Sequence, residues 1–340
     1  MTIEQIEEMV VSPIYDFLRT NEHLGNRIVF LTLGGSYAYG TNIETSDVDI
    51  RGCALNSQTD ILGLTNFQQV VDNKTDTTIY AFNRLIPLLI SCNPNTIEML
   101  GCKPEHYIYQ TDIGQAMVEN RKLFLSRVAA DSFGGYANDQ LQRLKSALAR
   151  DRLTQAEKEE HIRQSMEKAA RNFEKDHIAF KEGSVRLFTD ISEREGFDTE
   201  IFADIHIDKY PARQFNVLLN EMKNVLDNYK DLNHRNHKKD YAHLNKHAQH
   251  LIRLYLTGLD ILEKGDIHTY REAEREMLLD IRNGKYQNED GTYRQEFFDM
   301  VAEYEKKLDY AKRNSSLPDT PDMKRIQEFV MDVNRKALAM

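Results

Sequence analysis

The chain has 340 residues, 41% of them hydrophobic and 29% charged, which is enough for two domains with hydrophobic cores. Its 54 acidic against 44 basic residues give a net charge of −10, which argues against a nucleic-acid-binding surface spread over the whole chain but permits a local one. The sequence shows no membrane-spanning apolar run, no signal-peptide pattern and no Cys-x-x-Cys pair among its three cysteines, so we expect a cytoplasmic protein with free thiols.

The first hundred residues predict a mixture of helices and strands. An amphipathic helix is expected over Ile3–Leu18, followed by a buried strand over Ile28–Leu33 that enters a tight turn. Val48–Leu55 and the run that begins at Asp76 are further strand candidates, and Phe82–Ser91 reads as an apolar helix. This part of the chain therefore predicts a small mixed sheet flanked by helices.

From about Tyr109 onward the pattern changes to long amphipathic helices with many charges. The predicted helices are Thr154–His177, Ala212–Tyr229, Tyr241–Lys264, Tyr270–Arg282, Tyr293–Arg313 and Asp322–Lys336. Residues 184–208 interrupt them with β-branched side chains and predict a small hairpin or an irregular insertion. We therefore predict an α+β protein, with a catalytic domain over residues 1–110 and a mostly helical domain over 111–340.

The segment with the clearest chemistry is a glycine turn followed by paired aspartates. Gly34, Gly35 and Ser36 leave the first strand, where their backbone N–H groups and the serine hydroxyl could hold phosphate oxygens. Asp47 and Asp49 are two residues apart, so on a strand their carboxylates point to the same face. Like charges this close repel unless a cation lies between them, and oxygen ligands suit Mg²⁺ or Mn²⁺.

This order of motifs resembles the Gly-Ser…Asp-x-Asp signature of the DNA polymerase beta superfamily of nucleotidyltransferases. The resemblance implies a polymerase-beta-type core and a third carboxylate on a neighbouring strand, which completes a site for two metal ions. We choose Asp76 for this position, with Asp72 as the competitor and Asp60 as a more distant one. The superfamily chemistry would be transfer of a nucleoside monophosphate from an NTP to an acceptor hydroxyl, with release of pyrophosphate.

A closer resemblance extends across most of the chain, to the predicted nucleotidyltransferase branch associated with RNA-repair operons. Its matching segments are Gly35–Thr41, Ser46–Gly52, Asn93–Glu98, Tyr136–Leu141, Lys246–Arg253 and Ile281–Gly284. The resemblance implies the fold and the transfer chemistry, with ATP as the expected donor and RNA, either tRNA or an RNA end under repair, as the expected acceptor. A protein or small-molecule acceptor, and a nucleotide-binding regulatory module without turnover, remain alternatives at this point.

The expected nucleotide-binding residues are Gly35, Ser36, Thr41, Lys246 and Arg253. The two cations would face the cleft and neutralise the triphosphate. The same helix carries a stripe formed by His243, His247 and His250, which could share a Zn²⁺ or simply face solvent.

Three further residues or groups have weaker expectations. The basic stretch with Arg235, Lys238 and Lys239 is the place where we expect an RNA backbone to bind, although such runs are usually just solvated. Arg51 is expected on the sheet face opposite the aspartates, where it would brace the sheet. Glu98 is expected to close a capping box with Asn95, or else to contact the nucleotide or metal.

Overall fold

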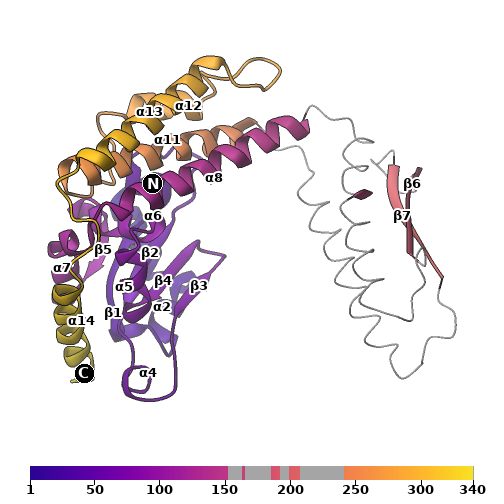
Figure 1. Ribbon diagram of the computed structural model, residues 1–340. Helices are drawn as coiled ribbons and strands as arrows, with labels where there is room; N and C mark the ends of the chain where they lie inside the picture. The colour runs from indigo at the N-terminus through magenta and orange to yellow at the C-terminus, as the bar shows by residue number, and fades with distance from the viewer. Residues whose placement is uncertain (152–162, 165–184, 192–198, 207–240, 340) are drawn as a thin grey trace. The chain divides into compact units, whose positions relative to one another are not determined.

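The computed structural model describes residues 1–151, 163–164, 185–191, 199–206 and 241–339. The chain forms two compact units, one made of residues 1–142 together with 241–340 and the other of residues 143–240 (Figure 1). We call them unit 1 and unit 2. The division into domains at about residue 110 stays a prediction.

A five-stranded mixed sheet lies at the centre of unit 1, with the strand order β3-β4-β2-β1-β5. The strands are β1 (Ile28–Leu33), β2 (Ile50–Ala54), β3 (Gln69–Asp72), β4 (Thr77–Ala81) and β5 (Tyr107–Gln110). Strand β2 runs antiparallel to β1 and parallel to β4, and the register places Leu33 beside Ile50 and Ile50 beside Thr77. The end of β1 and the starts of β2 and β4 therefore meet at one edge of the sheet.

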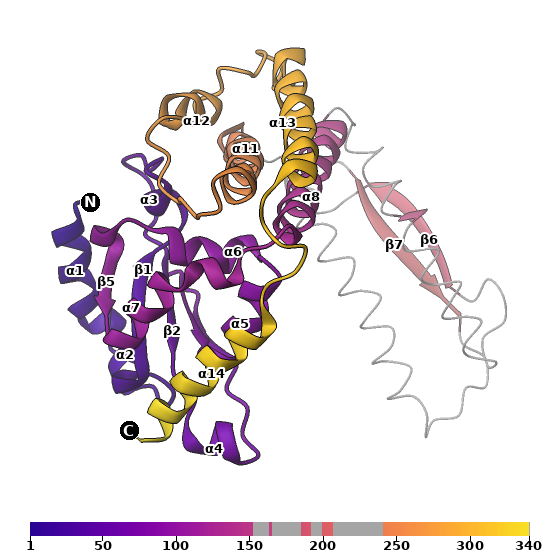
Figure 2. The same ribbon diagram turned by 60° about the vertical axis from the view of Figure 1, so that its left-hand side comes forward.

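Every residue of β1 is buried, because helices cover both faces of the sheet. On one face, Leu31 and Leu33 belong to a core shared with Ile6 and Leu18 of the first helices. On the other face, α7 approaches so closely that Gly114 lies against the backbone of Val29. Figure 2 shows α1 and α2 on one side of the sheet, with α5, α7 and α14 on the other.

The helices of the N-terminal stretch are α1 (Ile3–Val11), α2 (Phe17–Thr20), α3 (Gly35–Tyr39), α4 (Gln58–Leu62), α5 (Phe82–Ile90), α6 (Pro94–Ile97), α7 (Asp112–Glu119) and α8 (Val128–Asp151). The C-terminal stretch contributes α11 (Tyr241–Lys264), α12 (Arg275–Arg282), α13 (Gln295–Asn314) and α14 (Met323–Leu338). Short 3₁₀ turns are η1 (Pro13–Tyr15), η2 (Gly25–Arg27), η3 (Glu98–Gly101), η4 (Pro104–His106) and η5 (Arg121–Phe124).

Helix α11 is the central element of the helical part of unit 1. It packs against both α12 and α13 through a stripe that includes Leu244, Leu251 and Leu254. Helix α14 lies against α5, where Phe329 contacts Phe82 and Asn334 donates a hydrogen bond to Asn83. The architecture is the predicted one, a small mixed sheet flanked by helices and followed by a helical C-terminal region.

Several predicted element bounds need correction. The helix expected over Ile3–Leu18 is divided into α1, η1 and α2, because Pro13 cannot donate a backbone hydrogen bond to continue α1. Asp47 and Asp49 lie in the extended segment just before β2 rather than within the strand. The expected helices 154–177 and 212–229 lie outside the described residues.

In unit 2, β6 (Val185–Ile191) and β7 (Thr199–Ile205) form an antiparallel pair, so the interruption expected at residues 184–208 contains a two-stranded sheet. Within the described ranges, no helix combines the length and the apolar character needed to cross a membrane.

Candidate active site

The glycine turn and the paired aspartates meet at the sheet edge where β1 ends and β2 begins. The Gly34 amide donates a hydrogen bond of 2.8 Å to the Asp49 carbonyl, which joins the two segments. Gly35 has a φ of +51°, and a Cβ added there would lie 2.0 Å from Oδ2 of Asp49. Only glycine lets the backbone approach this carboxylate so closely.

The turn continues into the short helix α3, which ends at Gly40 with a φ of +71°. Ser36 lies on the first turn of α3 and is 9% exposed, and its carbonyl accepts a hydrogen bond of 2.9 Å from the Thr41 amide. The Thr41 hydroxyl is buried, and it finds no hydrogen-bond partner in the part of the chain that the structure describes. A buried hydroxyl without a partner is costly, so a ligand oxygen would satisfy it.

The two aspartates have different surroundings. Asp49 is largely buried and its carboxylate lies 2.9 Å from Nη2 of Arg51, whereas Asp47 is half-exposed and lies 3.7 Å from Nζ of Lys246. Burial raises the pKa of Asp49, Arg51 lowers it, and the negative charges of Asp47 and Asp76 raise it again. The charges of Asp47 and Asp76 therefore act on the Asp49 carboxylate at this edge.

The sheet face expected for Arg51 is wrong, although its contacts agree with the expected bracing of the sheet. Arg51 is two residues after Asp49, so both side chains leave the backbone on the same side, and its guanidinium bonds to that carboxylate rather than facing away. It also donates to the carbonyls of Ile50 and Asp76. Arg51 thus links the start of β2 to the start of β4 beside the aspartates.

The structure separates the three candidates for the third carboxylate. Asp76 immediately precedes β4, the neighbour of β2, and its carbonyl accepts the Ile50 amide at 3.2 Å. Asp72 instead accepts hydrogen bonds from the Lys74 and Thr75 amides and from the Thr75 hydroxyl within its own turn. These positions favour Asp76, whose role as a ligand stays a prediction.

Asp60 is the N-terminal capping partner of α4. Its carboxylate accepts hydrogen bonds from the hydroxyl and amide of Ser57 and from the Phe67 amide. Burial alone would raise the pKa of Asp60, but these bonds outweigh burial and lower it to about 2. The side chain is therefore occupied in local structure.

This cap leads to a pH-dependent prediction for Asp60→Asn. Because the pKa of Asp60 is lower in the folded chain than its ordinary value of 3.8, ionisation stabilises the fold above about pH 4. That contribution is lost as the pH falls toward 2. We expect Asp60→Asn to lower the urea midpoint at neutral pH and to differ less from the wild type at about pH 3. An equal difference at both pH values would contradict this assignment.

The donor set fits a magnesium ion. No group of three or more His, Cys, Asp or Glu side chains placed to hold a metal is found within the described residues. Proteins, however, usually bind Mg²⁺ through one or two carboxylates, with water and substrate phosphates completing the shell. Asp47 and Asp49, beside a turn that can hold phosphate oxygens, supply such a set.

Helix α11 brings the two predicted cations to the glycine turn and the aspartates. Lys246 approaches Asp47, and the guanidinium carbon of Arg253 lies 3.7 Å from the centre of the Tyr39 ring in α3. Arg253 Nε is buried and has no hydrogen-bond partner among the described residues. Lys246 therefore lies beside Asp47 and Arg253 beside the last residue of α3, and their binding of a triphosphate stays a prediction.

Three arginines that the sequence did not assign support the glycine turn. They donate to three consecutive carbonyls: the Arg271 amide to Tyr39 at 3.1 Å, Arg275 Nε to Gly40 at 2.7 Å and Arg282 Nη1 to Thr41 at 3.3 Å. Arg275 and Arg282 are seven residues apart on α12, so they share one helical face. That spacing was visible in the sequence, but nothing local pointed to the carbonyls.

The histidine stripe has partners within the protein. His247 lies 3.1 Å from the Gln140 side chain, and Nδ1 of His250 lies 2.8 Å from Nη2 of Arg253. The rings of His243 and His247 lie 5.8 Å apart at a tilted angle. The stripe thus connects α11 to α8 through His247, and His250 contacts Arg253 one turn along the same helix. Within the described residues, the stripe forms no metal-binding group.

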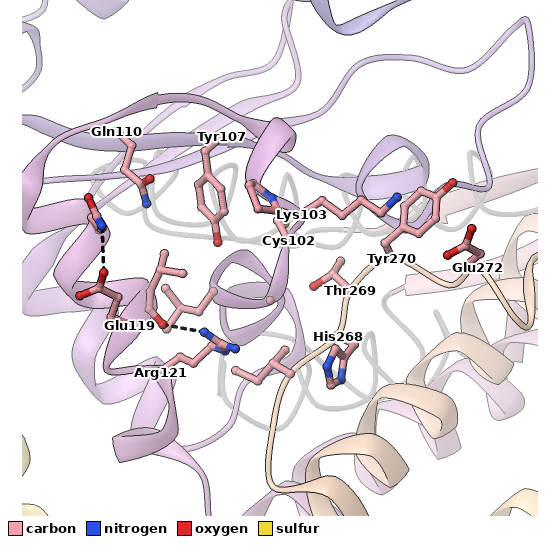
Figure 3. A pocket seen from close by; sticks show the side chains of 16 residues that line it. Cys102, Lys103, Tyr107, Gln110, Glu119, Arg121, His268, Thr269, Tyr270 and Glu272 are labelled. Atoms are coloured by element: carbon pink, nitrogen blue, oxygen red, sulfur yellow. Dashed lines mark hydrogen bonds between the residues drawn. The ribbon is translucent and has the colours of Figure 1, made fainter.

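A separate cavity of about 660 Å³ lies on the β5 side of the sheet (Figure 3). Its lining includes Lys103, Tyr107, Arg121 and Tyr270, and it contains none of the predicted catalytic residues. Tyr270 connects it with the active site, because the tyrosine ring lies so close to Gly40 that a Cβ there would clash with it at 2.4 Å.

Comparison with known proteins adds one match. Residues 9–168 match the family model of the RNA repair pathway DNA polymerase beta family. The match confirms the resemblance seen in the motifs and supports an activity of the nucleotidyltransferase type. No curated protein and no solved structure matches the chain.

Proposed function

We propose that this chain is a metal-dependent nucleotidyltransferase acting on RNA. Its residues 9–168 match the model of the RNA repair pathway DNA polymerase beta family. It would transfer a nucleoside monophosphate from an NTP, with ATP as the expected donor, to an RNA hydroxyl and release pyrophosphate. The observation that carries this proposal is the meeting of the glycine turn, Asp47, Asp49, Lys246 and Arg253 at one sheet edge.

In this mechanism each group has a separate task. Asp47 and Asp49 would hold Mg²⁺, and this ion would supply charge neutralisation on the phosphates and a lower pKa of the acceptor hydroxyl. Asp76 orients that hydroxyl for in-line attack on the α-phosphorus. Ser36 and the adjacent amides hold the β- and γ-phosphates as they become the leaving pyrophosphate. Lys246 and Arg253 offset the negative charge that develops on it.

The RNA acceptor rests on the family description and not on a described basic surface. Arg235, Lys238 and Lys239 lie outside the described residues, so their expected contact with an RNA backbone stays a prediction. A cytoplasmic location agrees with Cys53, Cys92 and Cys102, which are all free thiols.

The test incubates the purified protein with each α-³²P-labelled NTP, Mg²⁺ and mixed tRNA, beside an Asp47→Ala/Asp49→Ala control. Label on RNA that disappears in the control supports the proposal and identifies the nucleotide. Label on protein, or transfer that persists in the control, contradicts it. Replacing Mg²⁺ with EDTA is expected to stop transfer, and Mn²⁺ is expected to restore it.

Replacing Lys246 with methionine is expected to raise KM for the NTP about tenfold, because a charge that faces the triphosphate is removed. The matched control is Lys264→Met at the far end of α11, where the ammonium pairs with Asp260 at 2.7 Å. Steady-state kinetics at varied NTP measures both variants. Equal KM values for the two would place Lys246 outside the nucleotide site.

A further inference from the structure

We propose that Glu98 is a positioning residue for nucleotide binding: through Tyr39, it holds the guanidinium of Arg253 in place above the glycine turn. This inference rests on the proposed function and deepens it. It concerns how Arg253 is held in place. The capping box expected between Asn95 and Glu98 is not formed. The cap of α6 is Asn93, whose side chain accepts the Asn95 amide at 3.0 Å.

Tyr39 lies between Glu98 and Arg253. The ring is 2% exposed and lies 3.7 Å below the Arg253 guanidinium, while its hydroxyl donates a hydrogen bond to Oε2 of Glu98. The acid and the cation therefore contact the same aromatic ring, one at its hydroxyl and the other at its face. Tyr39 is also the last residue of α3, so the stack begins on the glycine turn itself.

Two hydrogen bonds hold the backbone of Glu98 in place. Glu98 is the first residue of η3, and its carbonyl accepts hydrogen bonds from the Thr269 hydroxyl at 2.6 Å and the Cys102 thiol at 3.5 Å. Burial and the Glu98 charge raise the pKa of Tyr39, so its hydroxyl remains protonated and continues to donate. Thr269 lies in the segment that joins α11 to α12. This segment thus holds the backbone of Glu98, the residue from which the contacts to Tyr39 and then to Arg253 begin.

Arg253 keeps one donor available for a ligand. Its Nη2 lies 2.8 Å from His250, whereas its Nε is buried without a hydrogen-bond partner among the described residues. A buried guanidinium N–H needs an acceptor, and phosphate oxygens are among the acceptors that guanidinium groups bind strongly. The stack would hold this N–H in position before the nucleotide arrives.

The negative charge of Glu98 strengthens the contact between the Tyr39 ring and the Arg253 guanidinium in two ways. A phenol that donates to a carboxylate gains electron density in its ring, which strengthens the attraction of that ring for a cation. The negative charge of Glu98 also attracts the guanidinium through a buried, low-dielectric region. Loss of either effect should leave Arg253 present but less well fixed, which lowers nucleotide affinity more than it lowers turnover.

The experiment compares Glu98→Gln and Tyr39→Phe with two matched controls, Glu105→Gln on η4 and Tyr37→Phe on the same helix α3. We expect the two stack variants to raise KM for the NTP, and the dissociation constant of α,β-methylene-ATP with Mg²⁺, about fivefold. kcat should change less than KM, and the controls should match the wild type. Thermal unfolding checks that each variant is folded.

A double-mutant cycle with Arg253→Met separates positioning from general loosening of the fold. If Tyr39 acts through the arginine, Tyr39→Phe should have no further effect on nucleotide affinity once Arg253 is replaced. Additive effects, or stack variants no weaker than the controls, would overturn the inference. Its failure is distinct from failure of the proposed function, which would appear as wild-type transfer that does not depend on Asp47 and Asp49.

Discussion

Asp49→Asn is expected to reduce kcat/KM for nucleotidyl transfer by at least about 10³-fold while the protein remains folded. Asp49 is the more buried of the paired aspartates, and it contacts both the glycine turn and Arg51. Under the proposed function, neutralising it would remove a metal ligand beside the bound triphosphate. The loss should appear in transfer of label from an α-³²P-NTP at saturating Mg²⁺.

The stability of the Asp49→Asn variant should not fall with its activity. The pKa of Asp49 is raised mainly by burial, so ionisation of Asp49 opposes folding above that pKa. Removing the charge is therefore expected not to lower the melting temperature at neutral pH. Asp72→Asn is the matched control, because Asp72 accepts hydrogen bonds within the turn between β3 and β4. If Asp72→Asn lost activity as severely as Asp49→Asn, Asp72 would replace Asp76 as the third carboxylate.

Gly35→Ala is expected to cost at least about 10²-fold in activity, although it adds only a methyl group. The new Cβ would lie 2.0 Å from Oδ2 of Asp49, and the φ of +51° is strained for alanine. Either the turn or the carboxylate must move, and each movement would separate the amides proposed to bind phosphate from the proposed metal ligands. Kinetics should show a lower kcat, because the groups remain present but are misplaced.

The control for this substitution is Gly135→Ala on α8, where an added Cβ meets no atom within 4 Å. Alanine favours a helix by about 1 kcal/mol over glycine, so this variant should keep full activity and unfold at a slightly higher temperature. Wild-type activity in Gly35→Ala, measured beside this control, would contradict the close approach of the turn to Asp49.

The parts of the fold that depend on local pattern were predictable. The strand Ile28–Leu33 and the helix Tyr241–Lys264 have the bounds that the sequence predicts, because apolar spacing and flanking turn residues determine both. The paired aspartates were singled out by their spacing together with the glycine turn before them. Asp47 and Asp49 precede β2, since a strand begins only where ladder hydrogen bonds begin, and the sequence does not show that point.

What the sequence could not show is which distant residues support the site. Nothing near Tyr39 in the sequence points to Glu98, and nothing near Arg275 points to the carbonyl of Gly40. The first contact depends on the packing of η3 against α3 and the second on the packing of α12 against α3, which are properties of the folded chain. Arg51 is different, because correct use of the two-residue period would have placed it beside Asp49.

The discontinuity of unit 1 has a consequence for the order in which the protein assembles. The bonds from Arg275 and Arg282 to the glycine turn join residues 235 and 241 positions apart in the chain. Loop-closure entropy rises by only about 0.6 kcal/mol for each doubling of loop length, so residues 143–240 cost the folded state little. Contacts so distant in sequence nevertheless form late. During synthesis the aspartates therefore emerge early, and the turn beside them gains its arginine support only when α12 has been made.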